Sequence, residues 1–340
     1  MPEVRRRIQG ALRWEVGLVF ALVGVVLFGI SSSSQFLTST NLFYLNLSIG
    51  EVAIMTLPMT LIIVTGEIDL SVASTLGMSS ALLGYLYAHG WSIPLAIAAA
   101  LVVGAAAGAA NGFLVTKVGL PSLAVTIGTL TLYRGIAIVI LGPQTVSTFP
   151  AKYTNIGVTS LPHTGGYVSY SVGFFLVLAI LFGIVLHATP FGRSLFVMGA
   201  NAEAARYAGL RVKRTKFRLF VLSGLVCAFA GILYTFRLST AVQDNGIGLE
   251  LSVVTIVLLG GVSIFGGRGS ILGVVLAIAV FAGLQSALFL TNFEQRAMGV
   301  VTGSLLLLSV LIPNASTFVR RGKDVLRRRE LRNAAVEPAS

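Results

Sequence analysis

The sequence predicts an all-α membrane protein that crosses the bilayer about ten times, as two inverted halves of five helices each. Composition is the first reason: 55% of the 340 residues are hydrophobic and only 11% are charged, with a mean hydropathy of +0.90. A soluble domain carries about 25% charged residues, so this chain cannot cover a water-exposed surface of ordinary size. The other two reasons are the order of its apolar runs and a weak internal repeat.

The apolar runs follow one another along nearly the whole chain. A helix needs about 20 residues to span a bilayer, so the run that begins at Leu249 is short and the run that begins at Ile93 is long. The ten predicted spans are Val16–Ile30, Leu45–Thr65, Leu70–Tyr87, Ile93–Val118, Leu123–Leu141, Ser169–His187, Phe217–Phe236, Leu249–Phe265, Ile271–Leu290 and Ala297–Ile312.

Polar segments divide the chain into five regions. A basic arm (1–15) precedes spans one to six (16–188), and a basic loop (189–218) separates them from spans seven to ten (219–313) and a basic tail (314–340). Between spans five and six, Gly142–Val168 reads as an external loop with three prolines. The tail could bind anionic lipid, although simple retention of the C-terminus inside the cell is the favoured interpretation.

The basic residues predict the orientation. Lys and Arg translocate poorly and therefore collect on the cytoplasmic side. With ten spans and the N-terminus inside, 20 of the 24 Lys and Arg residues are cytoplasmic. The exceptions are Lys152, Arg237 and Arg296 outside, and Arg134, placed near the start of a span. The net charge of +12 is thus explained by topology and does not indicate nucleic-acid binding.

Glycine serves helix packing here. The segment Gly104–Gly112 (GAAAGAANG) is almost entirely Gly and Ala, and small residues let helices approach closely in lipid. The Gly-rich segment Gly260–Ser270 lacks the Gly-Lys-Ser/Thr ending of a phosphate-binding loop. The chain is therefore not expected to bind ATP by that motif.

The basic loop contains one short predicted helix, Asn201–Ala208. It is rich in alanine and flanked by glycines, with Asn201 as its cap and Glu203 in its first turn; both features favour a helix start. We expect this helix to be offered to a partner outside the membrane.

The internal repeat predicts the inverted halves. Gly66–Ser74 and Gly248–Thr255 both contain an acid followed by Leu-Ser-Val, and a Gly/Ala-rich run follows each. Five spans separate the two copies, and an odd number inverts the topology. Transporters built this way commonly place their pathway between the repeats.

Acids near these copies are the candidates for that pathway. An ionised carboxylate costs several kcal/mol in lipid, so such acids face an interior, a cavity or an interface. Glu51 lies in the middle of an apolar run and is the one most expected to be buried and paired, while Asp69 has the alternative role of a helix cap. The candidate pathway or gate residues are Glu51, Gly66, Glu67, Asp69, Ser71, Asp244, Asn245 and Glu250.

Neither catalysis nor a cofactor is indicated. Cys227 is the single cysteine, the three histidines match no metal-ligand spacing, and no grouping of His, Asp and Ser favours hydrolysis. We expect a transport subunit without metal or cofactor.

Four motifs together carry a family resemblance: TGEIDLSVAS from Thr65, Gly192-Arg193, GANAEAARYAGLRV from Gly199, and LLGGVSIFGGRGS from Leu258. They resemble permease subunits of bacterial carbohydrate ABC importers of the ribose, arabinose, xylose and rhamnose type, over nearly the whole chain. The family usually has Gly-Gly before Ile-Asp-Leu-Ser where this chain has Gly66-Glu67, a departure that could mark a rhamnose-like or autoinducer-like branch.

The resemblance implies partners and a location. Such a permease pairs with a second permease, identical or not, in the bacterial inner membrane with both termini cytoplasmic. It takes a monosaccharide, rhamnose- or ribose-like, from a periplasmic binding protein and is driven by a separate cytoplasmic ATPase. The element that couples to the ATPase maps onto Asn201, Glu203, Ala204, Ala205, Arg206 and Gly209.

Two other functions stay open. A permease for autoinducer 2 or branched-chain amino acids would belong to the same superfamily. An ion-coupled secondary transporter, working through Glu51, Glu67 and Asp69, would be a different class.

Overall fold

The computed structural model describes residues 2–165, 167–291, 293 and 298–312, nearly all of them helical. The predicted tail (314–340) and Arg296 lie outside the described residues, as do the side chains of residues 2–13. The helices are α1 Pro2–Ser32, α2 Ser39–Val64, α3 Val72–Ala88, α4 Ile93–Phe113, the π-helical turn η1 Leu114–Val118, α5 Ser122–Leu141, α6 Ala151–Val158, α7 Tyr170–Ala188, α8 Pro190–Ala200, α9 Ala202–Tyr207, α10 Val212–Leu238, α11 Leu249–Leu259 and α12 Ile271–Leu290.

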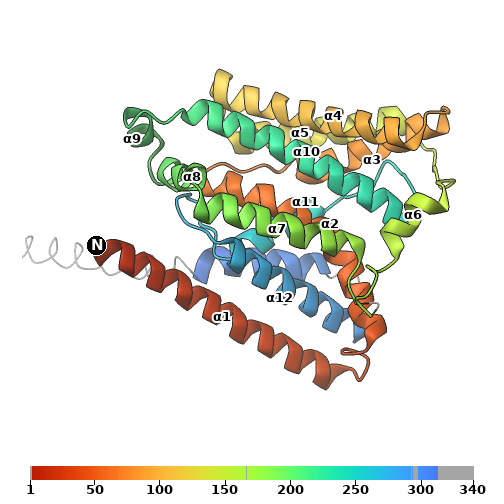
Figure 1. The fold of residues 1–340 in the computed structure, drawn as a ribbon, viewed down its shortest axis with the longest axis horizontal. Helices are drawn as coiled ribbons and strands as arrows, with labels where there is room; N and C mark the ends of the chain where they lie inside the picture. Colours follow the sequence, from red (N-terminus) through yellow and green to blue (C-terminus); the bar gives the residue numbers. More distant parts are fainter. Residues whose placement is uncertain (1, 166, 292, 294–297, 313–340) are drawn as a thin grey trace, which may run out of the picture.

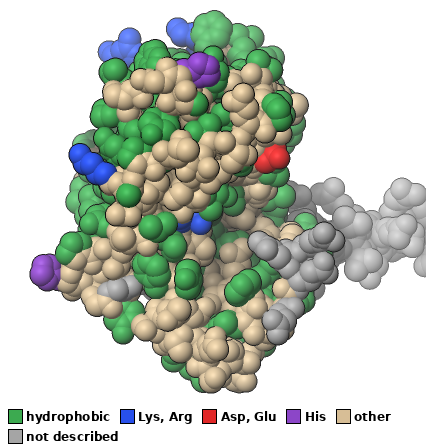
Figure 2. Space-filling view, turned by 90° about the vertical axis from the view of Figure 1, so that its right-hand side faces the viewer, with side chains coloured by type: hydrophobic (Ala, Val, Ile, Leu, Met, Phe, Trp, Pro, Cys, Tyr) green, Lys and Arg blue, Asp and Glu red, His purple; other side chains and the backbone are tan. Residues whose placement is uncertain are grey.

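The long helices lie side by side in one bundle (Figure 1). The short helices α8 and α9 lie at one end, with the start of α1, and α6 lies at the other; we call these the α9 end and the α6 end. In the described residues, β structure is limited to two isolated bridges, Val146 with Ala241 and Ser160 with Ser169. The face at the α6 end shows few charged side chains (Figure 2).

Seven of the described helices are long and apolar enough to cross a membrane, namely Trp14–Ser32, Ser39–Val64, Ile93–Val118, Ser122–Leu141, Tyr170–Ala188, Val212–Leu238 and Ile271–Leu290. Three of the ten predicted spans are shorter as helices: α3 has 17 residues, α11 has 11, and the last is Met298–Ile312. At about 1.5 Å per residue, α11 covers only about half of a bilayer core of about 30 Å.

Helix α2 forms the centre of the bundle. Every residue from Ile49 to Val64 is buried, and α7, α10, α11 and α12 pack around it. By contrast, only 11% of the apolar part of α1 is buried. Helix α1 packs along α12, and the Trp14 side chain donates a hydrogen bond to the Leu259 carbonyl, 2.9 Å away.

Helices α4 and α10 pack closely because glycines meet at their contact. A methyl group on Gly108 would lie 2.1 Å from the Phe220 carbonyl oxygen, and one on Gly224 would lie 2.1 Å from the Gly104 carbonyl oxygen. Larger residues do not fit at such positions without separating the helices. The packing role predicted for the Gly/Ala-rich segment Gly104–Gly112 is thereby explained.

Two segments are more ordered than the sequence predicted. The loop 189–218 holds a second helix, α8, which begins where the Thr189 side chain accepts the Gly192 N–H, with Pro190 in the first turn. Proline is favoured there because the first N–H groups of a helix lack partners. The predicted external loop Gly142–Val168 contains α6, which packs against α10.

Candidate functional site

The exposed helix α9 starts where the sequence predicted. The Asn201 side-chain oxygen accepts the N–H groups of Glu203 and Ala204, at 3.0 and 2.9 Å. Ala205 is fully buried, whereas Asn201, Glu203, Ala204, Arg206 and Gly209 are exposed. Helix α9 therefore packs on the protein through the Ala205 side chain, while the side chains of Glu203 and Arg206 are exposed to solvent.

A turn and a groove complete this surface. Gly209 ends the helix with φ +83°, a conformation that side chains other than Gly rarely adopt. Beside it, Ala202, Glu203, Arg206, Val212 and Lys213 line a groove of about 280 Å³. The exposed residues of α9 and this groove lie side by side at the α9 end.

Close backbone contacts hold the base of this surface. A methyl group on Gly199, in α8, would lie 1.8 Å from the Val64 carbonyl oxygen at the end of α2. The Gly267 N–H donates to the same oxygen at 2.8 Å. The end of α8 thus packs directly against the end of the central helix α2.

Glu67 makes a second connection at the α9 end. It follows Gly66, whose φ of +80° ends the turn after α2, and its carboxylate pairs with the Lys216 ammonium near the start of α10. The unusual acid of the Gly66-Glu67 sequence thus has a partner in the basic loop. The pair joins the segment after α2 to the helix that follows α9.

Asp69 and Ser71 lie in a buried polar network. Asp69 is 2% exposed, and its carboxylate accepts the Ser71 hydroxyl at 2.6 Å and the Ser223 hydroxyl of α10 at 3.0 Å. The Asn111 amide of α4 donates to the Ser71 oxygen at 2.8 Å, and the Tyr133 hydroxyl of α5 donates to Asn111 at 3.2 Å. One carboxylate therefore organises three helices around the start of α3.

The possible cap role of Asp69 is realised in a modified form. Ser71 is the cap residue of α3, and Asp69 accepts the Ser71 N–H at 3.1 Å from two residues before. This local turn satisfies a backbone donor ahead of the helix. In the described residues, neither of the two ion pairs includes Asp69.

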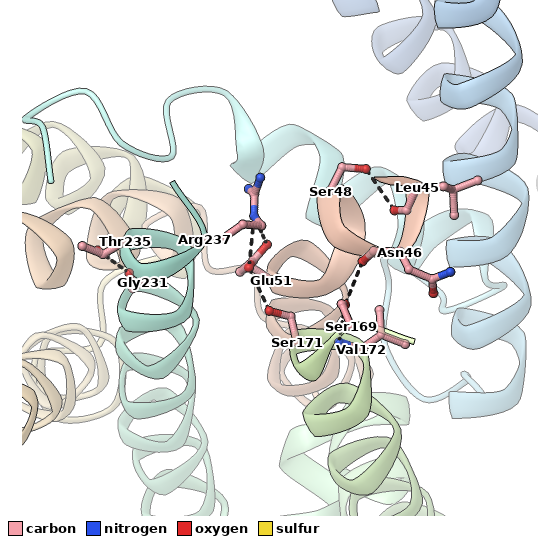
Figure 3. A network of polar contacts seen from close by, with 10 residues as sticks. All are labelled: Leu45, Asn46, Ser48, Glu51, Ser169, Ser171, Val172, Gly231, Thr235 and Arg237. Carbon is pink, nitrogen blue, oxygen red and sulfur yellow. Dashed lines mark hydrogen bonds and ion pairs between the residues drawn. The ribbon is translucent and has the colours of Figure 1, made fainter. Parts of the chain in front are cut away.

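Glu51 is buried and paired with Arg237 from the last turn of α10 (Figure 3). It is 1% exposed, and the Arg237 Nε donates to its two carboxylate oxygens at 3.2 and 3.1 Å. The Ser171 hydroxyl of α7 donates to it at 3.0 Å, and the Arg237 guanidinium lies 4.8 Å from the centre of the Tyr234 ring. This cluster connects α2, α7 and α10.

Asn245, in the segment between α10 and α11, makes a third set of buried polar contacts between helices. It is buried, and its amide donates to the Ser80 hydroxyl of α3 at 2.8 Å. The backbone carbonyl of Asn245 accepts a hydrogen bond from the Arg134 guanidinium at 2.7 Å. The sequence suggested that Arg134 lies near the start of a span. It is instead the thirteenth residue of α5.

The predicted pathway residues therefore do not form a single site. Asp69 and Ser71 share one network, Glu51 and Glu67 each have a separate cation, and Asp244 and Glu250 flank the Asn245 contact. Their partners Asn111, Tyr133 and Ser223 were not predicted from the sequence, and Arg134 and Arg237 were noted only as exceptions to the charge distribution. A charged residue inside or beside an apolar run was the available signal for Arg134 and Arg237.

A bundle in which seven of the described helices are long and apolar enough to cross a membrane has the architecture of a multi-pass membrane protein. Residues 41–310 match the family described as "Branched-chain amino acid transport system / permease component". The chain belongs to this family of permease components.

Similar proteins cover almost the same length. The autoinducer 2 import system permease protein LsrD of Yersinia enterocolitica is 34% identical over 88% of this chain and 91% of its own. The L-arabinose ABC transporter permease protein AraH of Azospirillum brasilense is 33% identical over 89% of each chain. LsrD of Yersinia pseudotuberculosis is 32% identical over 95% of this chain and 98% of its own. No solved structure matches the chain.

Proposed function

We propose that this permease moves a monosaccharide or a comparable small polyhydroxylated compound into the cell as part of an ATP-driven importer. The observation that carries the proposal is the similarity, over nearly the full length, to permeases named for import of L-arabinose and autoinducer 2. The family description names branched-chain amino acids, which remain the second candidate cargo.

The proposed assembly contains a second permease, a cytoplasmic ATPase and a periplasmic binding protein in the bacterial inner membrane. The α9 end faces the cytoplasm in this proposal, because the basic loop that contains α8 and α9 lies there. The groove between Glu203 and Lys213 then receives the ATPase. Closure of the ATPase would move α8 and α9, and through Gly199 the end of α2.

We propose ten membrane helices in two inverted halves around the central region. Supporting this, α3 and α11 are both short, and each follows a segment containing an acid. The segment 65–71 starts at the α9 end, whereas the segment 239–248 follows the opposite end of α10. The domain limits proposed above, 1–15, 16–188, 189–218, 219–313 and 314–340, follow this division.

Single cysteines test the orientation of the two halves. With Cys227 replaced by alanine, Glu67→Cys should react with a membrane-impermeant thiol reagent only from the cytoplasmic side, and Asp244→Cys only from the outside. The measurement is reagent labelling in intact cells and in inverted membrane vesicles. Labelling of both positions from the same side contradicts the inverted arrangement.

The energy source distinguishes this importer from an ion-coupled transporter. In an importer, Asp69 organises a hydrogen-bond network, and Asp69→Asn keeps an oxygen that can accept the Ser71 N–H. We expect this variant and Glu67→Gln to retain part of the uptake rate, and uptake to stop when ATP is depleted. An ion-coupled transporter needs a titrating or ion-binding carboxylate, so one of these variants would lose accumulation completely.

The measurement is uptake of labelled L-arabinose and autoinducer 2 in cells, first with ATP depleted and the proton gradient maintained, then with an uncoupler and ATP maintained. Uptake that survives ATP depletion but stops with the uncoupler would contradict the proposed function.

A further inference from the structure

Three charged side chains lie around the segment that leads into α11. Arg134 of α5, Glu250 in the first turn of α11 and Asp244 in the segment before it are all at least partly exposed. The Arg134 guanidinium reaches this segment by donating to the backbone carbonyl of Asn245, which is next to Asp244 and five residues before Glu250. Neither of the two ion pairs in the described residues includes Arg134.

This surface lies deep in the membrane. Arg134 is twelve residues past the start of α5, or about 18 Å along a helix that rises about 1.5 Å per residue. The hydrogen bond from Arg134 to the Asn245 carbonyl places the segment that leads into α11 at a similar depth. The hydrocarbon core is about 30 Å thick, and the three charges lie near its middle.

Charged groups at that depth face a protein interior or a water-filled cavity, because lipid does not solvate them. The start of α11 adds to the polarity, since Gly248 is its cap residue and no side chain satisfies the first N–H groups. The surface must therefore be covered by something other than lipid.

We propose that Arg134, Asp244 and Glu250 line the translocation pathway, between this chain and the second permease, and hydrogen-bond the hydroxyl groups of the substrate. This rests on the proposed function. A guanidinium only donates hydrogen bonds and a carboxylate only accepts them, whereas each hydroxyl group does both. A polyhydroxylated molecule can thus bridge Arg134 and Glu250 as it passes and leave both groups solvated when it is gone.

Water access to this surface is tested without knowing the cargo. In a Cys227→Ala background, Leu251→Cys places a thiol next to Glu250 on the exposed side of α11, where Leu251 is 48% exposed. We expect it to react with a small water-soluble thiol reagent at least tenfold faster than Val177→Cys on α7, a residue 67% exposed that faces lipid in this proposal. Equal, slow reaction of both thiols overturns the proposal.

The substrate contact is tested in vesicles that contain the permease, its ATPase and the binding protein, with L-arabinose as the probe. We expect Arg134→Gln to lower the maximal uptake rate at least tenfold, Arg134→Lys to restore part of it, and ATPase binding to stay unchanged. The same loss of ATPase binding as of uptake would overturn the contact. Slower labelling of Leu251→Cys with L-leucine but not L-arabinose would overturn the hydroxyl chemistry.

Different results would contradict the proposed cargo class and the proposed lining of the pathway. Absence of ATP-driven uptake of both L-arabinose and autoinducer 2 by the unaltered permease contradicts the proposed cargo class. Labelling of Leu251→Cys still reports, in that case, whether the charged surface lines a water-filled pathway.

Discussion

Replacing Arg237 with alanine is expected to remove most of the folded permease from the membrane. Glu51 is 1% exposed and would keep its carboxylate without the guanidinium that now holds both of its oxygens. Leaving one partner of a buried ion pair alone costs about 3–5 kcal/mol, a large part of the stability of a typical domain. The measurement is the amount of monodisperse protein extracted in detergent and its thermal unfolding midpoint.

The matched control removes both charges. The double variant Glu51→Gln, Arg237→Gln leaves no uncompensated charge, and it is expected to recover most of the folded protein because two neutral amides can still hydrogen-bond each other and Ser171. Lys152→Ala, which removes an exposed cation at the same end, should have no effect. An Arg237→Ala protein as abundant and as stable as the unaltered one would show that Glu51 has another partner.

Replacing Gly209 with valine, or Glu203 with lysine, is expected to abolish uptake while the permease stays in the membrane. Gly209 has φ +83°, where a side chain costs about 1–2 kcal/mol, and a β-branched one fits worst. No atom lies within 4 Å of the position a Cβ would take, so the effect is on the direction of α9 rather than on packing. Glu203→Lys reverses the charge at the start of α9.

The assay compares uptake with the amount of permease and of ATPase that purify together. Lys117→Ala serves as the control, because Lys117 is exposed in η1, outside the α8–α9 surface. Normal uptake by both Gly209→Val and Glu203→Lys would contradict the coupling role of α9.

Much of the helical layout follows from hydropathy. The predicted run Ile271–Leu290 coincides with α12, and Ile93–Val118 coincides with α4 and η1 together. These limits are marked in the sequence, since Ser270 caps α12 and Gly119 ends η1 with φ +90°. The central position of α2 could not be predicted, because a helix buried all round and one surrounded by lipid are both apolar on every side.

The pairing of charges could not be predicted either. Glu51 and Arg237 are 186 residues apart in sequence, and Arg134 and Asn245 are 111 apart. Charge counting predicts that Arg237 lies on the external side of the membrane, but it does not predict that the side chain is only 15% exposed and pairs with Glu51. The hydropathy pattern predicts approximately how far along a membrane helix a charged residue lies. The residue with which it pairs depends on how the helices pack against one another.

The contact between Glu67 and Lys216 bears on how such permeases diverge. The family resemblance leads us to expect a second glycine where Glu67 stands, and a glycine offers no charge to a lysine. Lys216 has this acid as its salt-bridge partner, so a lineage that acquired Glu67 alone would have left a carboxylate only 18% exposed without its cation. We therefore expect the acid and the base to be inherited as a pair, and permeases that keep the glycine to show free variation at the position of Lys216.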